Sequence, residues 1–168
     1  LDAIAGIDAP PARTVRVGLV GTMARWKGHE VFLKALAQLP ADLPVRGYII
    51  GGALYQTQGS QYGIDELQRI AAGMGLEGKV GFTGFVEDPA AAMRSLDVVV
   101  HASTKPEPFG LVIVEAMACG RAAIASESGG AAEIIAKAGS LSLSACKPND
   151  PRALSACIER LARDPGLR

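Results

Sequence analysis

Short apolar segments alternate with longer amphipathic segments along almost the whole chain, and this alternation constrains the fold more than any other feature. The segments at residues 15–21 (VRVGLVG), 45–51 (VRGYIIG) and 97–101 (DVVVH) have the length and the β-branched content of buried strands. Residues 28–39 repeat apolar side chains at the three- and four-residue spacing of a helix that faces a core. Strands that alternate with helices predict parallel βαβ units.

The same reasoning assigns the remaining elements. Further strands are expected at residues 79–82, 121–125 and, more weakly, 141–143, and further helices at residues 65–74, 89–96, 110–118, 131–137 and 151–162. Near-continuous apolar strands, such as VVV at residues 98–100, indicate a sheet covered on both faces. The prediction is one doubly wound, Rossmann-like α/β domain over residues 15–168, with a mainly parallel sheet of about six strands. Residues 1–14 lack periodicity and are interpreted as a linker.

Charge and composition exclude several kinds of partner. The 168 residues include 17 basic and 17 acidic side chains, so we expect no general nucleic-acid-binding surface and no strong membrane signal. The chain has no apolar run of the roughly 20 residues that span a bilayer, and it does not start like a signal peptide. Cys119, Cys146 and Cys157 have no metal-ligand spacing and are interpreted as small core residues in a reducing cytoplasm. The alternative to a cytoplasmic location is that the full-length protein binds at the membrane periphery.

Doubly wound sheets bind ligands beyond the carboxyl ends of their strands, at the point where the strand order reverses. Function is therefore expected in the loops that follow strands, at residues 22–27, 51–62, 83–88 and 102–109.

The segment EPFGLVIVE places Glu107 and Glu115 on either side of a helix start at Gly110. The neighbours of Glu115 are apolar on every side, which predicts a buried helix and a partnered carboxylate. The free N–H groups at the helix start form an anion site that Gly110 lets a ligand approach closely. Carboxylates beside such a site are suited to ribose or hexose hydroxyl groups. The competing interpretation places both glutamates on the solvated surface.

Arg25 and Lys27 lie in the segment GTMARWKG, between the first strand and the first helix. This position favours a cationic clamp on a pyrophosphate, with Gly21 and Gly28 allowing close approach, over a merely solvated basic loop. The Walker ending and the GxGxxG fingerprint are both absent, which argues against a P-loop protein and a nicotinamide dehydrogenase.

Three further features are less specific. His101 ends a buried strand and is interpreted as a core histidine with satisfied hydrogen bonds. Gly51 and Gly52 either admit a ligand or simply end a strand. Residues 128–130 (SGG) form either a second point of ligand approach or a tight turn.

These motifs together resemble one protein family. The segments GTMARWKGHEVFLKAL, KVGFTGFVED, HASTKPEPFGLVIVEAMACGRAAIASESGGAAEII and PNDPRALSACIERL closely resemble the C-terminal half of group-one (family 4) glycosyltransferases. That family comprises retaining enzymes of the GT-B architecture, which has two Rossmann-like domains. The resemblance covers nearly the whole chain from about residue 15, and residues 101–134 are its most specific part.

The resemblance implies a role for each matching residue. Glu107 would contact hydroxyl groups of the donor sugar, Glu115 the ribose, and Lys27 the diphosphate. Backbone N–H groups that bind sugar and diphosphate would come from Phe109, Gly110, Leu111 and Val112. The main chain at Phe85 and Val86 would surround the base.

One position departs from the family pattern. Many members have an arginine directly after the glycine that matches Gly21, whereas this chain has Thr22. Arg25 is the candidate substitute, and with Lys27 and Glu107 it completes the expected catalytic group.

The resemblance therefore implies the donor-binding domain of a retaining glycosyltransferase that uses a nucleotide-diphosphate sugar and needs no metal or other cofactor. The partner domain that holds the acceptor is not in this chain, and residues 1–14 resemble the linker that joins the two domains. The chain alone is expected to be inactive. The alternatives are a nucleotide-sugar-binding module without turnover and a sugar-nucleotide epimerase or phosphorylase of the same architecture.

Overall fold

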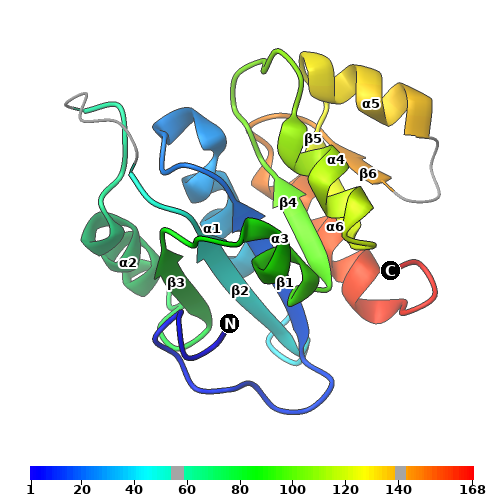
Figure 1. Ribbon diagram of the computed structural model, residues 1–168. Coiled ribbons are helices and arrows are strands. Elements are labelled where there is room, and N and C mark those ends of the chain that lie inside the picture. The colour runs from blue at the N-terminus through cyan, green and yellow to red at the C-terminus, as the bar shows by residue number, and fades with distance from the viewer. Residues whose placement is uncertain (54–58, 139–142) are drawn as a thin grey trace.

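One parallel sheet organises the computed structural model, which describes residues 1–53, 59–138 and 143–168. Its strands are β1 (Val15–Val20), β2 (Val45–Ile50), β3 (Val80–Gly84), β4 (Val98–His101), β5 (Ala122–Ser126) and β6 (Leu143–Cys146). They lie side by side in the order β3-β2-β1-β4-β5-β6, as Figure 1 shows. The order reverses between β1 and β4, so the predicted doubly wound α/β fold is confirmed.

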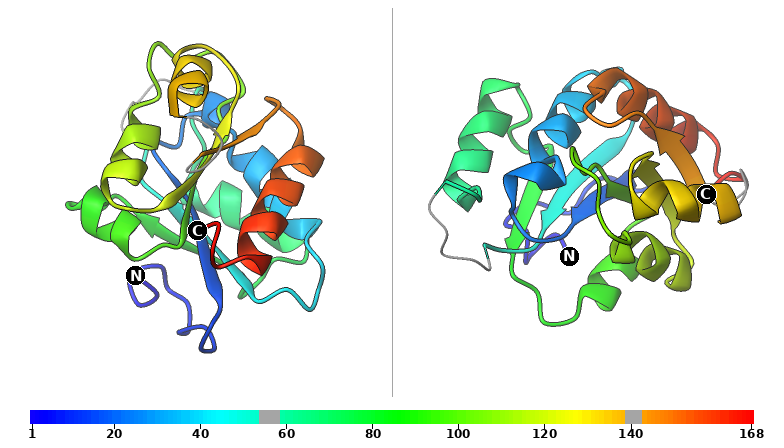
Figure 2. Two further views of the ribbon diagram at one scale, coloured as in Figure 1. Left: turned by 90° about the vertical axis from the view of Figure 1, so that its right-hand side faces the viewer. Right: turned by 90° about the horizontal axis from the view of Figure 1, so that it is seen from above.

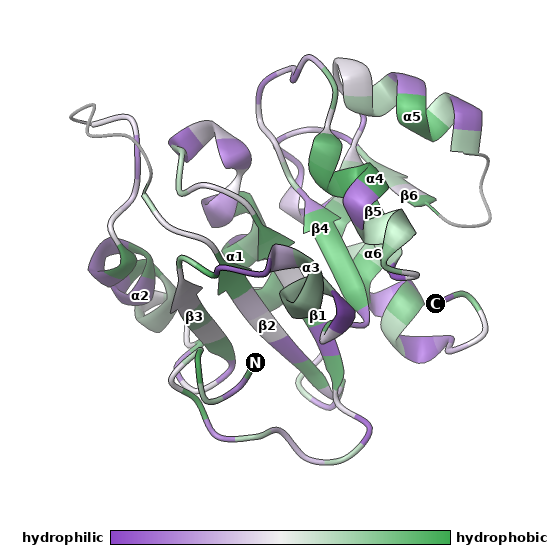
Figure 3. Cartoon of the chain, viewed as in Figure 1, coloured by the Kyte–Doolittle hydropathy of each residue, from purple (hydrophilic) through white to green (hydrophobic). Residues whose placement is uncertain are grey.

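Helices cover both faces of the sheet. They are the short 3₁₀ turn η1 (Arg25–Lys27) and the α-helices α1 (His29–Ala37), α2 (Ile64–Gly73), α3 (Pro89–Arg94), α4 (Leu111–Ala118), α5 (Gly130–Ala138) and α6 (Pro151–Arg163). In Figure 2 the sheet separates α1 and α6 from α3 and α4. This two-sided cover explains the apolar run of three valines, residues 98–100, in β4, and the strand is coloured hydrophobic in Figure 3.

All predicted strands and helices lie within three residues of their observed bounds. The last strand differs most: β6 runs over Leu143–Cys146, whereas the predicted strand is at residues 141–143, of which 141 and 142 fall outside the described part of the chain. The shift arises because the pattern LSAC is too short and too polar to indicate where the strand begins. The turn η1 was not predicted, since a single 3₁₀ turn has no periodicity to detect.

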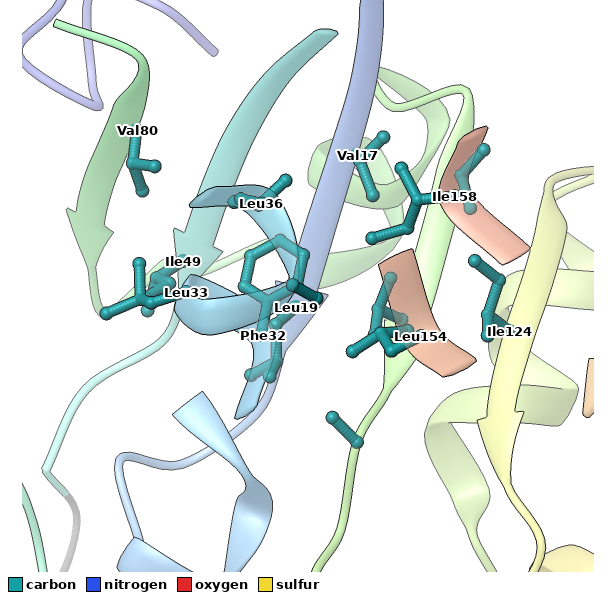
Figure 4. Close-up of a cluster of buried hydrophobic side chains, with 14 of the residues drawn as sticks. Val17, Leu19, Phe32, Leu33, Leu36, Ile49, Val80, Ile124, Leu154 and Ile158 are labelled. Carbon is teal, nitrogen blue, oxygen red and sulfur yellow. The ribbon is translucent and has the colours of Figure 1, made fainter. Parts of the chain in front are cut away.

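The larger core layer lies between the sheet and helices α1, α2 and α6. Figure 4 shows Phe32 and Leu33 of α1, together with Leu154 and Ile158 of α6, directed at the strands, and all four are fully buried. Burying a side chain of this size contributes roughly 1.5–3 kcal/mol. The second layer, on the opposite face, packs α3, α4 and α5 on the sheet, with Met93 at its centre.

The N-terminal segment packs against the edge of this second layer. The carboxylate of Asp2 accepts hydrogen bonds from Arg16 Nη2, at 2.8 Å, and from the hydroxyl of Tyr48. Ala5 is buried, and its carbonyl accepts from the backbone N–H of Phe82 at 3.2 Å. Residues 1–14 are thus attached to the sheet, and their role as an interdomain linker stays a prediction.

None of the helices in the described ranges combines the length and apolarity needed to cross a membrane.

Of the three cysteines expected in the core, only Cys146 is buried, whereas Cys119 and Cys157 are partly exposed.

Candidate functional site

A pocket of about 320 Å³ opens at the carboxyl ends of β1 and β2, next to the point where the strand order reverses. This is where ligands bind in doubly wound sheets. The predicted site residues in its wall are Gly21, Thr22, Lys27, Phe85, Val86, Glu107, Leu111, Val112 and Glu115. Four loops far apart in sequence therefore meet at one place, because the carboxyl ends of parallel strands share one edge of the sheet.

A larger cavity, of about 510 Å³, lies at the opposite edge, near Pro40 and Pro44. Arg46 and Lys79 are the charged side chains among its lining residues, and no carboxylate faces them there. The pocket at the carboxyl edge is smaller, but a cation and two carboxylates converge on it. Such convergent polar groups characterise a specific binding site.

Glu107 is the most strongly held side chain of the pocket. Its carboxylate accepts hydrogen bonds from Lys27 Nζ at 2.9 Å, from His101 Nε2 at 2.9 Å and from the hydroxyl of Ser103. Burial of the side chain, which is 9% exposed, raises the pKa of Glu107. The donors from His101, Ser103 and Lys27 outweigh burial and lower this pKa to about 2. Glu107 is therefore a carboxylate that only accepts hydrogen bonds.

The loop that carries Lys27 is pressed against the segment after β4. Gly28 has φ 80°, and a Cβ atom there would lie 1.9 Å from the carbonyl oxygen of Ala102, so only glycine fits. The carbonyl of Trp26 accepts a hydrogen bond from the backbone N–H of Thr104 at 2.7 Å. Lys27 Nζ also lies 4.3 Å from the centroid of the Trp26 ring. These contacts aim the ammonium group at Glu107.

Helix α4 begins at the pocket. Gly110 is its N-cap residue, with φ 90°, and the first N–H groups of the helix have no carbonyl partner within the helix. The predicted burial of this helix on all sides is wrong, because only Ile113 and Ala116 are buried whereas Leu111 is 59% exposed. Glu115 is likewise exposed and lines the pocket.

Helix α4 is only partly buried because one side of it packs on β4 and β5 while the other side faces the opening of the pocket. An apolar sequence shows that a helix has few polar side chains. It does not show on how many sides other elements pack against that helix.

The structure does not bring Arg25 to this pocket. Its Nη2 donates to Glu66 at 2.8 Å, and its Nε donates to the carbonyl of Gly59 at 3.0 Å. The guanidinium also lies 4.3 Å from the centroid of the Tyr62 ring. In the described part of the chain, Arg25 thus fastens η1 to the start of α2 and is not among the residues that line the pocket wall.

The interpretation of His101 as a satisfied core histidine is confirmed. It is 4% exposed, and its Nδ1 lies 3.2 Å from the hydroxyl of Ser126. Sequence reasoning missed Ser103, Ser126 and the bond from His101 to Glu107. The available signal was the position of His101 at the carboxyl end of a buried strand, just before the loop that returns with Glu107.

The glycine pairs also have defined roles. Gly130 N–H donates to the carbonyl of Glu107 at 2.8 Å, so the turn at residues 128–130 packs against the glutamate segment. Gly51 and Gly52 both line the pocket. At Gly51 a Cβ atom would lie 1.9 Å from the carbonyl oxygen of Gly21, which shows that the close approach there is between two backbone segments.

Within the residues that the structure describes, no group of three His, Cys, Asp or Glu side chains is arranged to hold a metal ion.

The family model described as "Glycosyl transferases group 1" matches residues 8–168. This chain belongs to the group 1 glycosyltransferase family. Among curated members, it is 32% identical to the D-inositol 3-phosphate glycosyltransferase of Corynebacterium jeikeium, over 94% of this chain and 38% of that protein. It is 30% identical to a lipopolysaccharide core mannosyltransferase of Rhizobium leguminosarum, over 99% of this chain and 45% of that protein. The chain thus spans less than half the length of these relatives.

Solved structures of similar proteins have the same fold. The Anabaena protein HepE, crystallised with UDP-glucose, has a TM-score of 0.82 and 35% identity, over 93% of this chain and 41% of that chain. The C-terminal domain of a Francisella tularensis group 1 protein, LpcC, has a TM-score of 0.75 and 26% identity, over 99% of this chain and 90% of that chain. This chain therefore corresponds to the C-terminal domain of the GT-B architecture.

Proposed function

We propose that this chain is the donor-binding domain of a retaining glycosyltransferase that transfers a sugar from a nucleotide-diphosphate sugar. One observation carries the proposal: Lys27, Glu107, Glu115 and the start of α4 converge on a single pocket at the switch point of the sheet. The complex of the similar protein HepE with UDP-glucose supports the same class of ligand.

Each group has a role that follows from its chemistry. The N–H groups at the start of α4, at Phe109, Gly110, Leu111 and Val112, and the ammonium of Lys27 bind the diphosphate and stabilise its charge as it leaves. Glu107 binds hydroxyl groups of the sugar and so orients the reacting carbon. Glu115, exposed at the wall, accepts from the ribose, and the main chain at Gly21, Thr22, Phe85 and Val86 surrounds the remaining nucleotide.

Exposed apolar side chains lie in the pocket wall, at Phe85 and Leu111, and next to it in sequence, at Phe109. Phe85, Phe109 and Leu111 are 68%, 54% and 59% exposed. Large exposed apolar side chains grouped at one edge indicate a surface that another component covers. In the complete enzyme we assign that cover to the bound donor and to an acceptor-binding N-terminal domain.

The pocket has few positive charges for a diphosphate, so the charges of the pocket raise the question of whether transfer needs a metal ion. Among its lining residues in the described ranges, Lys27 is the cation, and it already pairs with Glu107. We propose that the amide groups of α4 supply the remaining stabilisation of the leaving group, without a metal ion. Transfer by the complete protein that persists after chelation with EDTA supports this, and transfer that stops until Mg²⁺ or Mn²⁺ is restored contradicts it.

Nucleotide titration tests the site. We expect this chain to bind a nucleoside diphosphate among UDP, GDP and ADP, and Lys27→Ala to weaken that binding about ten- to hundredfold, since a charge-assisted contact contributes roughly 1.5–3 kcal/mol. The corresponding nucleoside should lose little affinity. Arg25→Ala is the matched control, because its side chain points to Glu66, and we expect it to leave the affinity within about twofold. Equal losses for nucleoside and diphosphate would contradict the assignment of Lys27.

Product analysis with the complete protein tests the reaction. An NMR spectrum of the product that shows the donor's anomeric configuration supports retention, and the opposite configuration overturns it. Interconverted sugar nucleotide without an acceptor product would instead identify an epimerase.

A further inference from the structure

Behind Glu107, a chain of hydrogen bonds leads from the pocket into the sheet. His101 ends β4 and Ser126 ends β5, and both are buried, at 4% and 1% exposure. Ser103, at 1% exposure, lies in the loop between His101 and Glu107. The hydroxyl of Ser126 is 3.2 Å from His101 Nδ1 and 2.9 Å from the carbonyl of Ser103. Three buried polar side chains thus support one carboxylate.

The two oxygens of Glu107 differ in how many donors they meet. Oε1 accepts from His101 Nε2 and from the hydroxyl of Ser103, so both of its lone-pair positions are used. Oε2 accepts from Lys27 Nζ alone among the hydrogen bonds of the described residues. Oε2 therefore keeps one lone pair that a ligand hydroxyl can reach beside the lysine.

The hydrogen on one nitrogen of His101 follows from its partner. A carboxylate supplies no hydrogen, so His101 Nε2 must carry the hydrogen in the contact with Glu107 Oε1. The main chain of Glu107 is fixed separately, since Gly130 N–H donates to its carbonyl. With the backbone held there and Oε1 held by His101 and Ser103, the direction of Oε2 is determined.

We propose that His101 is a positioning residue for Glu107, oriented by Ser126, and that it reserves the free lone pair of Oε2 for a hydroxyl group of the donor sugar. The proposal rests on the proposed function and deepens it, because it assigns one carboxylate oxygen to the sugar and one to the protein. A buried hydrogen-bond network whose members all have partners makes a site rigid, and this is what the positioning role requires.

Binding of a nucleotide and of its sugar derivative by this chain separates positioning from mere packing. His101→Leu removes the Nε2 donor, whereas His101→Gln keeps an N–H donor of similar reach. We expect His101→Leu to weaken UDP-glucose, or GDP-mannose if the chain prefers GDP, about tenfold while the parent diphosphate changes by less than about twofold. His101→Gln should recover most of the loss.

Ser126→Ala, a milder change, should give a smaller loss for the sugar nucleotide alone. Ser155→Ala, at a buried serine of α6 outside this network, is the matched control and should change neither affinity. Equal losses for the sugar nucleotide and for the diphosphate in His101→Leu would overturn the proposal.

A second measurement does not depend on any ligand. NMR titration of the Glu107 carboxyl carbon should show its pKa rising by about one unit in His101→Leu and returning toward the wild-type value in His101→Gln. An unchanged pKa of Glu107 in His101→Leu overturns the proposal even if the variant binds nucleotides normally. A wild-type chain that binds none of these nucleotides would instead contradict the proposed function, and the titration would still decide whether His101 holds Glu107.

Discussion

At Glu107, burial and hydrogen bonding act on the same carboxylate in opposite directions. Burial alone would raise its pKa, yet the donors from His101, Ser103 and Lys27 lower it to about 2, against an ordinary value of 4.5. The folded state thus prefers the ionised form more than the unfolded state does. In the role proposed for Glu107, the sugar would therefore meet a carboxylate that stays ionised at any physiological pH.

The first prediction concerns the acid stability of Glu107. Because its pKa is lower in the folded state, its contribution is present above pH 4.5 and is lost as the pH falls from 4.5 towards 2. This lowering of the pKa corresponds to a contribution of at most about 3 kcal/mol to the free energy of unfolding. We expect the stability difference between wild type and Glu107→Gln, measured by urea unfolding, to shrink markedly between pH 7 and pH 2.5. A difference that is constant with pH would contradict it.

His29 gives the second prediction, in a different pH range. The side chain is fully buried at the start of α1, and its ring lies edge-on to Tyr62 with the centroids 5.7 Å apart. Burial lowers the pKa of His29 from 6.5 to about 4, so the unfolded chain takes up the proton first as the pH falls. Stability that is complete above pH 6.5 should decline by up to about 3 kcal/mol towards pH 4.

Replacement of His29 by a side chain that does not titrate provides the test. In His29→Gln, urea unfolding should no longer show the part of the decline between pH 6.5 and 4 that wild type shows. If both proteins lose the same stability over that range, His29 is not the group responsible.

At the scale of elements, the site depends on how closely η1 approaches the segment after β4. Lys27 meets Glu107 because Gly28 lies directly against the carbonyl of Ala102. Two of the four loops that form the pocket are thus held together by backbone contacts. Met23 of one loop and Ala102 of the other are buried in the core, so a change at this contact affects both the site and the packing beneath it.

The third prediction tests this contact with Gly28→Ala. The added Cβ would lie 1.9 Å from a carbonyl oxygen, at a φ of 80° that alanine rarely adopts, so one of the two loops must move. We expect a loss of about 2 kcal/mol or more in urea unfolding and weaker binding of nucleoside diphosphate. The matched control is Gly73→Ala at the end of α2, where a Cβ meets nothing within 4 Å and stability should rise by roughly 0.5 kcal/mol. Unchanged binding by a folded Gly28→Ala would contradict the role of this contact.

At the scale of the whole molecule, the function proposed above makes this chain one side of a reaction site. Its pocket opens at the carboxyl edge of the sheet, where Phe85, Phe109 and Leu111 are exposed. It spans 38% to 45% of the two bacterial relatives described above. Transfer requires an acceptor that is held next to the donor.

The fourth prediction follows from that geometry. We expect the 168-residue chain to bind a nucleoside diphosphate sugar without transferring the sugar to any acceptor, and a longer protein that contains it to do both. Calorimetry combined with a radiolabelled transfer assay checks both parts. Transfer by the 168-residue chain alone would contradict the division of labour between two domains.

Particular residues show where sequence reasoning succeeded at the site and where it could not. Lys27 and Arg25 lie two residues apart in one loop and were assigned the same role, yet Lys27 meets Glu107, 80 residues further along the chain, and Arg25 meets Glu66, 41 residues further along. No local pattern distinguishes the two, because the direction of each side chain depends on a 3₁₀ turn and on a distant partner. The same reason explains Glu115, whose apolar neighbours predicted burial although its side of α4 is open.

By itself, the sequence determined the alternation of strands and helices, the two-sided sheet and the edge at which the site lies. The elements follow from hydrophobic periodicity, which can be read within short segments of the chain. The edge follows from the general rule that parallel sheets bind ligands at the carboxyl ends of their strands. Only the tertiary structure decided which side chains meet: that His101 and Ser103 hold one oxygen of Glu107, that Lys27 holds the other, and that Arg25 points elsewhere. Such pairings depend on how segments far apart in the sequence are placed relative to one another, and that placement is set by packing.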